Sequence, residues 1–138
     1  MIKIQKEDFN LEKEIQKLKN KYSTVGAVTS FVGYVREFNN NSKVESINLD
    51  VYEDMAHKQL NKIIDEARSK WKIIDCLIIH RYGKLNVNDK IVLVCCYSEH
   101  RQESFESCKF IMDYLKKDAP FWKKENYKKN SKWLINSN

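Results

Sequence analysis

The sequence predicts an α+β fold in which helices pack on a mainly antiparallel sheet. Two observations lead to this class. Short segments rich in valine, isoleucine and aromatic residues alternate with amphipathic segments, and the expected order of elements is β-α-β-β-α-β-β-α. Three glycines and one proline in 138 residues leave little room for a linker. We therefore expect residues 1–138 to form a single domain.

The first third of the chain is expected to contain two strands and one helix. A short strand covers Ile2–Gln5, and a helix follows over Leu11–Tyr22. Valine, threonine and aromatic residues then favour a strand over Gly26–Arg36. Three successive asparagines (39–41) make Glu37–Lys43 a polar loop, which is expected to be mobile by its composition.

The middle of the chain is expected to form a strand and a helix. Polar and apolar residues alternate over Val44–Tyr52, which is typical of a strand with one buried face. Met55–Trp71 has the spacing of an amphipathic helix. Its apolar stripe is expected to consist of Ala56, Leu60, Ile63, Ile64, Ala67 and Trp71.

The second half of the chain is expected to add two apolar strands and a long helix. The strands are Ile73–Arg81 and Lys90–Tyr97, with a turn at Gly83 between them. The helix covers Glu99–Lys117 and ends before Pro120, because proline cannot continue a helix.

The Glu99–Lys117 helix is apolar on two sides. At 100° per residue, Phe110 and Tyr114 lie nearly opposite the main apolar face. A helix of this kind usually packs against other elements on both sides. We expect its own sheet to cover one side and another subunit or an insertion to cover the other. Two exposed aromatic side chains are the alternative. The main apolar face consists of Phe105, Cys108, Ile111, Met112 and Leu115.

The net charge of +6 is concentrated near the C-terminus. Residues 109–138 carry +5, so the first 108 residues carry only +1. A cationic quarter of this kind attracts an anion, whether a phosphate-bearing metabolite, an acidic protein or a nucleic acid. Charge alone does not choose between these partners.

The four cysteines are expected to be reduced and buried. They show neither CxxC nor Cys/His metal-ligand spacing, so we expect no metal site. We also expect no cofactor. No apolar run approaches the roughly 20 residues that span a bilayer, and the N-terminal MIKIQKEDFN lacks the apolar core of an export signal. We therefore expect a cytoplasmic protein with no membrane partner. The cysteines are Cys76, Cys95, Cys96 and Cys108.

Basic residues from separate parts of the chain are expected to meet in an anion-binding site. His100 and Arg101 open the last expected helix, where free backbone N–H groups and the helix dipole already favour an anion. Arg36 closes the Gly26–Arg36 strand. For each residue alone, the alternative is a solvated surface charge or a helix cap.

Two lysines lie in apolar surroundings. Lys116 follows Met112 by one helical turn, and Lys123 follows Phe121 and Trp122 in a segment too apolar to lie free in water. Partial burial near other cations lowers the pKa of a lysine, which lets it act as an acid or base near neutrality. We expect these two lysines to join the anion-binding residues.

Three stretches of the chain carry distinctive motifs. The first is GAVTSFVGYVR, a glycine-led strand that ends in G-x-V-R. The second joins YEDMA to the helical IIDEARSKW. The third is IIHRYGKLNVNDKIVLVCCYSEHRQESFESCKFIMDYLKKDAPFWKKE, with an I-H-R-x-G-x-L turn, an E-H-R helix start and the run A-P-F-W-K. Over about residues 24–126 these motifs resemble the MoaE family, the catalytic subunits of molybdopterin synthase, whereas the N-terminal helix and the tail after Glu125 match poorly.

The resemblance assigns roles to the residues that match the family's pattern. It makes Lys116 and Lys123 the expected catalytic lysines, and it places Arg36, His100 and Arg101 at anion-binding positions. It also implies a hammerhead-like form of the α+β fold. The other expected substrate-binding residues are Phe31, Tyr34, Val35, Met112, Lys124 and Glu125.

The resemblance also implies a reaction and its partners. The family converts cyclic pyranopterin monophosphate to molybdopterin by installing two dithiolene sulfurs. Sulfur arrives as a thiocarboxylate at the Gly-Gly end of a small ubiquitin-like subunit of MoaD type, and two copies of each subunit form a heterotetramer around a homodimer of the large chain. The lysines would shuttle protons and stabilise developing charge as sulfur replaces oxygen, so no nucleophilic cysteine is required.

The chain departs from the family's pattern at three places. Tyr34 occupies a position that is expected to be small or basic, and asparagines 39–41 replace a loop that is expected to contain glycine. The tail beyond Trp133 is short, although the tail can contribute to the neighbouring protomer's site in this family. These departures concern the surroundings of the site and not the reaction.

Two other functions are alternatives to sulfur transfer. A basic nucleic-acid-binding module would explain the pI of about 9.1, but the chain has no RNP-like strand, GXXG loop or helix-turn-helix spacing. A rhodanese-type sulfur carrier would use Cys95 or Cys108, but neither cysteine heads an anion-binding loop that could activate a thiolate.

Overall fold

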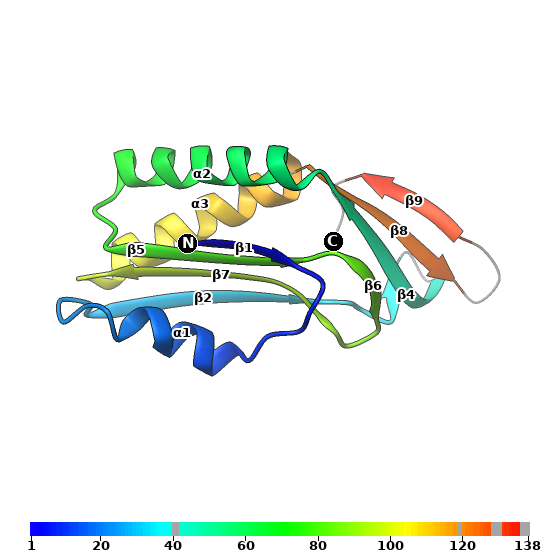
Figure 1. Ribbon diagram of the computed structural model, residues 1–138, viewed down its shortest axis with the longest axis horizontal. Coiled ribbons are helices and arrows are strands. Elements are labelled where there is room, and N and C mark those ends of the chain that lie inside the picture. The colour runs from blue at the N-terminus through cyan, green and yellow to red at the C-terminus, as the bar shows by residue number, and fades with distance from the viewer. Residues whose placement is uncertain (40–41, 119, 128–130, 136–138) are drawn as a thin grey trace.

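The computed structural model describes residues 1–39, 42–118, 120–127 and 131–135, and it has the expected α+β class (Figure 1). Helices and strands alternate irregularly along the chain, as they do in this class. The elements are β1 (Ile2–Gln5), α1 (Leu11–Lys19), β2 (Ala27–Tyr34), β3 (Phe38–Asn39), β4 (Ser42–Val51), α2 (Glu53–Lys70), β5 (Asp75–Arg81), β6 (Gly83–Asn86), β7 (Lys90–Ser98), α3 (Arg101–Lys117), β8 (Phe121–Tyr127) and β9 (Ser131–Ile135).

The strands of the described residues form two sheets. The first has the order β1-β5-β7-β2, in which β1 runs parallel to β5 and the other pairs are antiparallel. The second has the order β3-β4-β8-β9, and β6 also pairs with β4. Figure 1 shows α1 on one face of the first sheet, α2 and α3 on the other face, and the second sheet at one end of the molecule.

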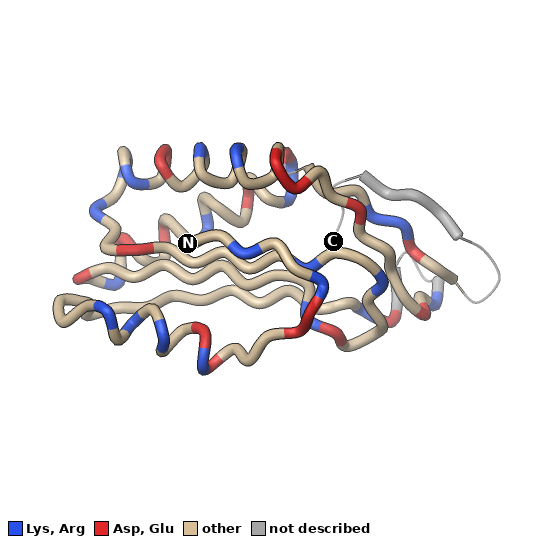
Figure 2. Tube along the Cα trace, viewed as in Figure 1, with Lys and Arg blue, Asp and Glu red and all other residues tan. Residues whose placement is uncertain are grey.

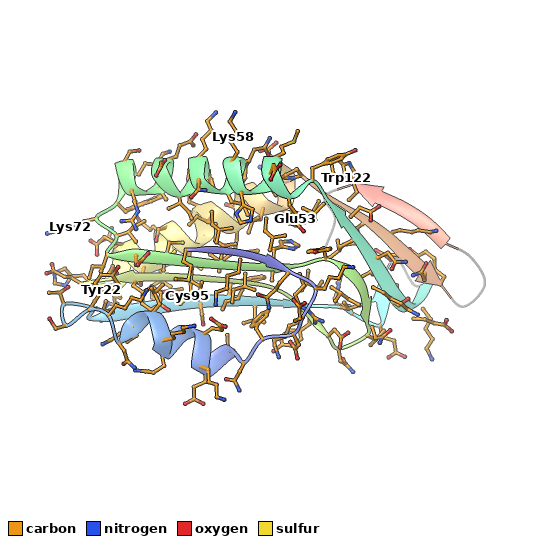
Figure 3. All side chains as sticks on the ribbon, in the orientation of Figure 1. Tyr22, Glu53, Lys58, Lys72, Cys95 and Trp122 are labelled. Atoms are coloured by element: carbon orange, nitrogen blue, oxygen red, sulfur yellow. The ribbon has the colours of Figure 1, made fainter. Side chains whose placement is uncertain are left out.

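The middle of each central strand, residues 76–79 of β5 and residues 91–96 of β7, is apolar because helices cover both faces of the sheet there. Cys76, Ile78, Val94 and Cys96 belong to the cluster that includes α2 and α3 residues. The alternate residues of both strands, together with Phe9 and Leu18, form the cluster on the α1 side. Cys95 lies on that side (Figure 3). All four cysteines are buried and free of disulfides, as expected.

The second apolar side of α3 is covered by α2 of the same chain. Phe110 contacts Trp71 edge to face, with ring centroids 5.4 Å apart, and the Tyr114 hydroxyl donates a hydrogen bond to Gln59 Oε1 at 3.1 Å. The expectation that another subunit or an insertion covers this side is therefore wrong. Phe105, which was expected on the buried face, is 61% exposed instead.

The stripe expected on α2 is confirmed. Five of its six residues lie in the helix and are buried. The sixth, Trp71, is the C-cap residue of the helix and is half-buried. No helix in the described part of the chain is both long enough and apolar enough to cross a membrane.

Several strands were not expected from the sequence. Phe38–Asn39 and the start of β4 form a small hairpin inside the segment expected to be a loop, whereas residues 40–41 lie outside the described residues. The expected turn at Gly83 is the first residue of β6, with a positive φ of 87° that glycine adopts readily. The sequence predicts no helix or strand for the segments that form β8 and β9.

Gly26 permits a close approach at the start of β2. Its N–H donates to the carbonyl of Ser98 at 2.9 Å, and a Cβ placed on it would collide with the backbone carbonyl oxygen of Glu99. Because a backbone atom cannot move aside as a side chain can, we expect Gly26→Ala to lower the free energy of unfolding by about 1–3 kcal/mol in urea denaturation.

Gly33→Ala is the matched control for Gly26→Ala. A Cβ on Gly33 would first meet the Cγ1 of Val92 at 3.0 Å, which is a side-chain atom that can shift. We expect the smaller loss of stability from this substitution. Equal losses in the two variants would mean that the contact with Glu99 is not what requires glycine at position 26.

Candidate functional site

A pocket of about 600 Å³ lies between the C-terminal end of α3, the first sheet and β8. We call it the basic pocket. Apolar and aromatic side chains form much of its wall, as in most small-molecule sites. It is lined by Phe31, Val32, Gly33, Tyr34, Arg36, Leu49, His80, Ile91, Val92, Met112, Asp113, Leu115, Lys116, Phe121 and Lys123.

Strand register builds part of the pocket wall. Gly33 of β2 and His80 of β5 are both paired with Val92 of β7, so the three residues form a row across one face of the sheet. Residues directly opposite each other in antiparallel strands project to the same face. Because Gly33 has no side chain, the β2 end of this row leaves space in the pocket.

Among the described residues, three cationic side chains line this pocket, and they come from three different parts of the chain. Arg36 follows β2, Lys116 lies in the last turn of α3, and Lys123 lies in β8. One acidic residue, Asp113, also lines the pocket, and it forms an ion pair with Lys109 at 2.8 Å. Elsewhere the charges are mixed: acidic and basic residues are interspersed along α2 (Figure 2). The pocket therefore favours an anion.

Burial lowers the pKa of Lys123. The positive charge of Arg36 lowers this pKa further, while the carboxylate of Glu125 opposes the shift. Removal from water disfavours the charged form of a lysine, and a nearby cation acts in the same direction. Lys123 therefore gives up its proton more readily than an ordinary lysine.

The alternation of β8 explains why Lys123 faces the pocket and Lys124 does not line it. Trp122, next to Lys123, contacts Tyr52 edge to face at 4.8 Å near the start of α2 (Figure 3). Glu125 lies on the same side of the strand as Lys123, is 2% exposed, and accepts a hydrogen bond from the Tyr127 hydroxyl at 2.8 Å. Glu125 therefore influences Lys123 without lining the pocket.

The structure brings together six of the residues expected from the sequence. Val35 is not among them, because its side chain is buried in a core cluster with residues of β4 and β6, and its N–H donates to the carbonyl of Asp89 at 2.9 Å. Lys124 and Glu125 do not line the pocket either. The six that do are Phe31, Tyr34, Arg36, Met112, Lys116 and Lys123.

His100 and Arg101 lie at the far end of α3. His100 is the N-cap of this helix and Arg101 is its first residue, and both are exposed. Fifteen residues separate Arg101 from Lys116, which at 1.5 Å per residue is about 22 Å along the helix axis. Within one chain, His100 and Arg101 therefore do not meet Lys116 and Lys123, and their role in binding the substrate stays a prediction.

Sequence reasoning missed His80 and Phe121 as lining residues. The I-H-R-x-G-x-L turn contains His80, but nothing in the sequence distinguishes this histidine from a core residue of an apolar strand. In the structure, the imidazole of His80 stacks on the ring of Phe121, with centroids 3.6 Å apart. Within the described residues there is no group of three or more His, Cys, Asp or Glu that could hold a metal ion.

The family model described as MoaE protein matches residues 4–118. This chain belongs to the MoaE family. The match covers most of the chain, and it includes the N-terminal helix, which the sequence motifs had suggested to be a poor match. The family predicted from the motifs is therefore confirmed, and the basic pocket is the candidate active site of a MoaE protein.

Similar proteins and solved structures support the assignment of this chain to the MoaE family. The molybdopterin synthase catalytic subunit of Ralstonia nicotianae is 47% identical over 96% of this chain and 76% of its own length. The structure of molybdopterin synthase from Staphylococcus aureus is 32% identical, with a TM-score of 0.89 over 96% of both chains. The predicted enzyme class, a molybdopterin synthase catalytic subunit that transfers sulfur, is confirmed, and nothing supports the nucleic-acid alternative.

A more distant structure shares the fold of this MoaE protein. It is the complex of subunits 1 and 2 of molybdopterin-converting factor from Helicobacter pylori. The TM-score is 0.80 at 19% identity, over 96% of this chain and 88% of the other. At that identity the likeness concerns the fold.

Proposed function

We propose that the basic pocket binds cyclic pyranopterin monophosphate and that the chain converts it to molybdopterin by transferring two sulfur atoms. The observation that carries this proposal is the convergence of Arg36, Lys116 and Lys123 on one partly apolar pocket. A phosphate requires cationic donors, and a pterin ring requires apolar contact area such as Phe31 and Met112 provide.

The two lysines have different roles in this proposal. Lys123, whose pKa is lowered by burial, transfers protons at the reacting atoms. Lys116 is exposed at the pocket wall and stabilises the negative charge that develops as sulfur replaces oxygen. Arg36 binds the anionic part of the substrate. None of these steps requires a cysteine, and all four cysteines are buried in the core.

The sulfur donor in this proposal is a small ubiquitin-like subunit that ends in Gly-Gly and carries a thiocarboxylate. A thiocarboxylate is an anion, so it is attracted to the same basic residues as the substrate phosphate. The two-subunit complex from Helicobacter pylori is the kind of assembly expected. A cytoplasmic location is part of the same proposal.

His100 and Arg101 can take part only through a second copy of the chain. They lie about 22 Å along α3 from Lys116, so they cannot reach the same pocket within one chain. We propose that, in a homodimer, the α3 N-terminus of one protomer contributes these residues to the pocket of the other. Two large and two small subunits would then form the complete enzyme.

Reconstitution with purified components tests the proposed function. The chain is mixed with cyclic pyranopterin monophosphate and a thiocarboxylated small subunit, and the pterin is analysed by mass spectrometry. We expect a product that contains two sulfurs, and light scattering should give the mass of a two-plus-two complex. The same small subunit with an ordinary carboxylate should give no product.

Two outcomes would contradict the proposal. A chain that binds the small subunit but leaves the pterin unchanged would exclude the reaction. A strictly monomeric chain that is nevertheless fully active would exclude the shared site at His100 and Arg101.

A further inference from the structure

His80 is held firmly at the end of β5. The next residue, Arg81, projects to the other face of the sheet, where its guanidinium donates to the carbonyls of Lys6 at 3.1 Å and Lys90 at 2.9 Å. Arg81 also forms an ion pair with Asp8 at 3.8 Å. These contacts fix the backbone of the strand end, and with it the direction in which His80 projects.

The contacts of His80 determine which ring nitrogen carries the proton. Nδ1 lies 2.9 Å from the carbonyl oxygen of Arg81. A carbonyl can only accept a hydrogen bond, so Nδ1 is the protonated nitrogen and Nε2 has a free lone pair. The ring also stacks on Phe121, with an interplanar angle of 13°.

Nε2 is a buried acceptor that lacks a hydrogen bond within the described part of the chain. His80 is only 8% exposed, and among the described residues its imidazole makes one hydrogen bond, through Nδ1 to Arg81, and one ring contact, with Phe121. A buried polar atom without a partner is uncommon and costs free energy. Since His80 lines the basic pocket, a bound ligand can supply the missing donor.

His80 differs in kind from the charged residues around the pocket. Arg36 after β2, Lys116 on α3 and Lys123 on β8 are cationic donors, and Asp113 on α3 is paired with Lys109. Burial, with a smaller contribution from the charge of Lys123, lowers the pKa of His80 to about 4, although the hydrogen bond to the Arg81 carbonyl acts in the opposite direction. The imidazole therefore stays neutral, and Nε2 stays an acceptor, throughout the neutral pH range.

We propose that Nε2 of His80 binds the substrate by accepting a hydrogen bond from a ring N–H or O–H of the pterin. This inference rests on the proposed function. The cations bind the anionic part of the substrate, whereas His80 recognises a neutral donor on the ring system. His80 would thus distinguish a pterin from a simple phosphate ester, which the cations alone cannot do.

Two substitutions separate the two nitrogens. His80→Asn retains a donor near the position of Nδ1 and loses the acceptor at Nε2, whereas His80→Gln places an amide oxygen near Nε2 and loses the donor at Nδ1. We expect His80→Asn to weaken binding of cyclic pyranopterin monophosphate about ten-fold in calorimetry, as for one neutral hydrogen bond. His80→Gln should bind within about three-fold of the parent.

A structural role for His80 predicts a different pattern. Both variants would then lose affinity in proportion to their loss of melting temperature, and His80→Gln would restore nothing. In turnover assays with the small subunit, we expect His80→Asn to raise KM while kcat changes little, because a binding contact is lost and not a proton-transfer step.

NMR provides a readout that does not depend on activity. The chain has three histidines, so ¹⁵N-histidine labelling gives three imidazoles, and His80→Asn identifies the signal of His80. Adding cyclic pyranopterin monophosphate should shift the Nε2 resonance as it accepts a hydrogen bond, whereas inorganic phosphate alone should not. If the parent chain binds the pterin but Nε2 does not shift and His80→Asn binds normally, the inference is wrong and the proposed function stands. If the parent chain does not bind the pterin, both fail.

Discussion

We expect Lys116→Ala to reduce molybdopterin formation by at least a hundred-fold while the variant still folds and binds the small subunit. Lys116 lines the basic pocket from the last turn of α3, next to Met112 and opposite β8. A side chain that transfers a proton or stabilises charge in the transition state typically contributes about 10²–10⁴ in rate. Single-turnover measurements with a thiocarboxylated small subunit would quantify the loss.

Lys117→Ala is the matched control for Lys116→Ala. The two lysines are neighbours with the same charge, but they are 100° apart around the helix, and Lys117 does not line the pocket. We expect Lys117→Ala to remain within a few-fold of the parent. Equal losses in both variants, with assembly intact, would mean that only the summed positive charge of this helix end matters.

The helices and central strands could be predicted from the sequence because their patterns are locally complete. The α2 stripe has five buried residues at helical spacing, and β5 and β7 are apolar runs of strand length. The partner of the second α3 face could not be predicted, because periodicity shows that a face is covered but not by what. Here Trp71 and Gln59 of the same chain cover it.

In the second sheet, β4 could be predicted from its alternation, but β8 and β9 could not, because their pairing is long-range and the composition of β8 is polar. β8 contains Lys123, Lys124 and Glu125 in succession, which does not suggest a strand. It forms one because β4 and β9 pair with it on either side. Propensity is a weak guide when pairing with neighbouring strands decides the structure.

In the candidate site, too, some residues could be predicted from the sequence and others could not. The motifs identified Arg36, Lys116 and Lys123, and the structure brings their side chains to one pocket. The motifs also suggested that Arg101 joins them, although helix geometry alone places it about 22 Å from Lys116. His80 escaped notice because a histidine in an apolar strand is usually a core residue, and only its contacts show that one nitrogen lacks a partner within the described chain.

Lys123→Ala is expected to cost a hundred-fold or more in molybdopterin formation. Its neighbour in β8, Lys124, does not line the pocket, so Lys124→Ala should have little effect on the chemical step. Lys123→Arg should not restore activity, because an arginine stays protonated and cannot transfer a proton near neutral pH. Full activity of Lys123→Arg would show that this position supplies only a positive charge.

The pH dependence of turnover gives a sharper test of Lys123, because its two charged neighbours shift its pKa in opposite directions. Arg36 lowers the pKa of Lys123 and Glu125 raises it. Removing the cation in Arg36→Met should therefore move the limb of the kcat/KM–pH profile that belongs to Lys123 to higher pH. Removing the carboxylate in Glu125→Gln should move the same limb to lower pH. These directions hold whether the limb rises, as for a lysine acting as the free amine, or falls, as for one acting as the ammonium. Shifts of the same sign in both variants, or a limb that neither substitution moves, would assign the titration to a group other than Lys123.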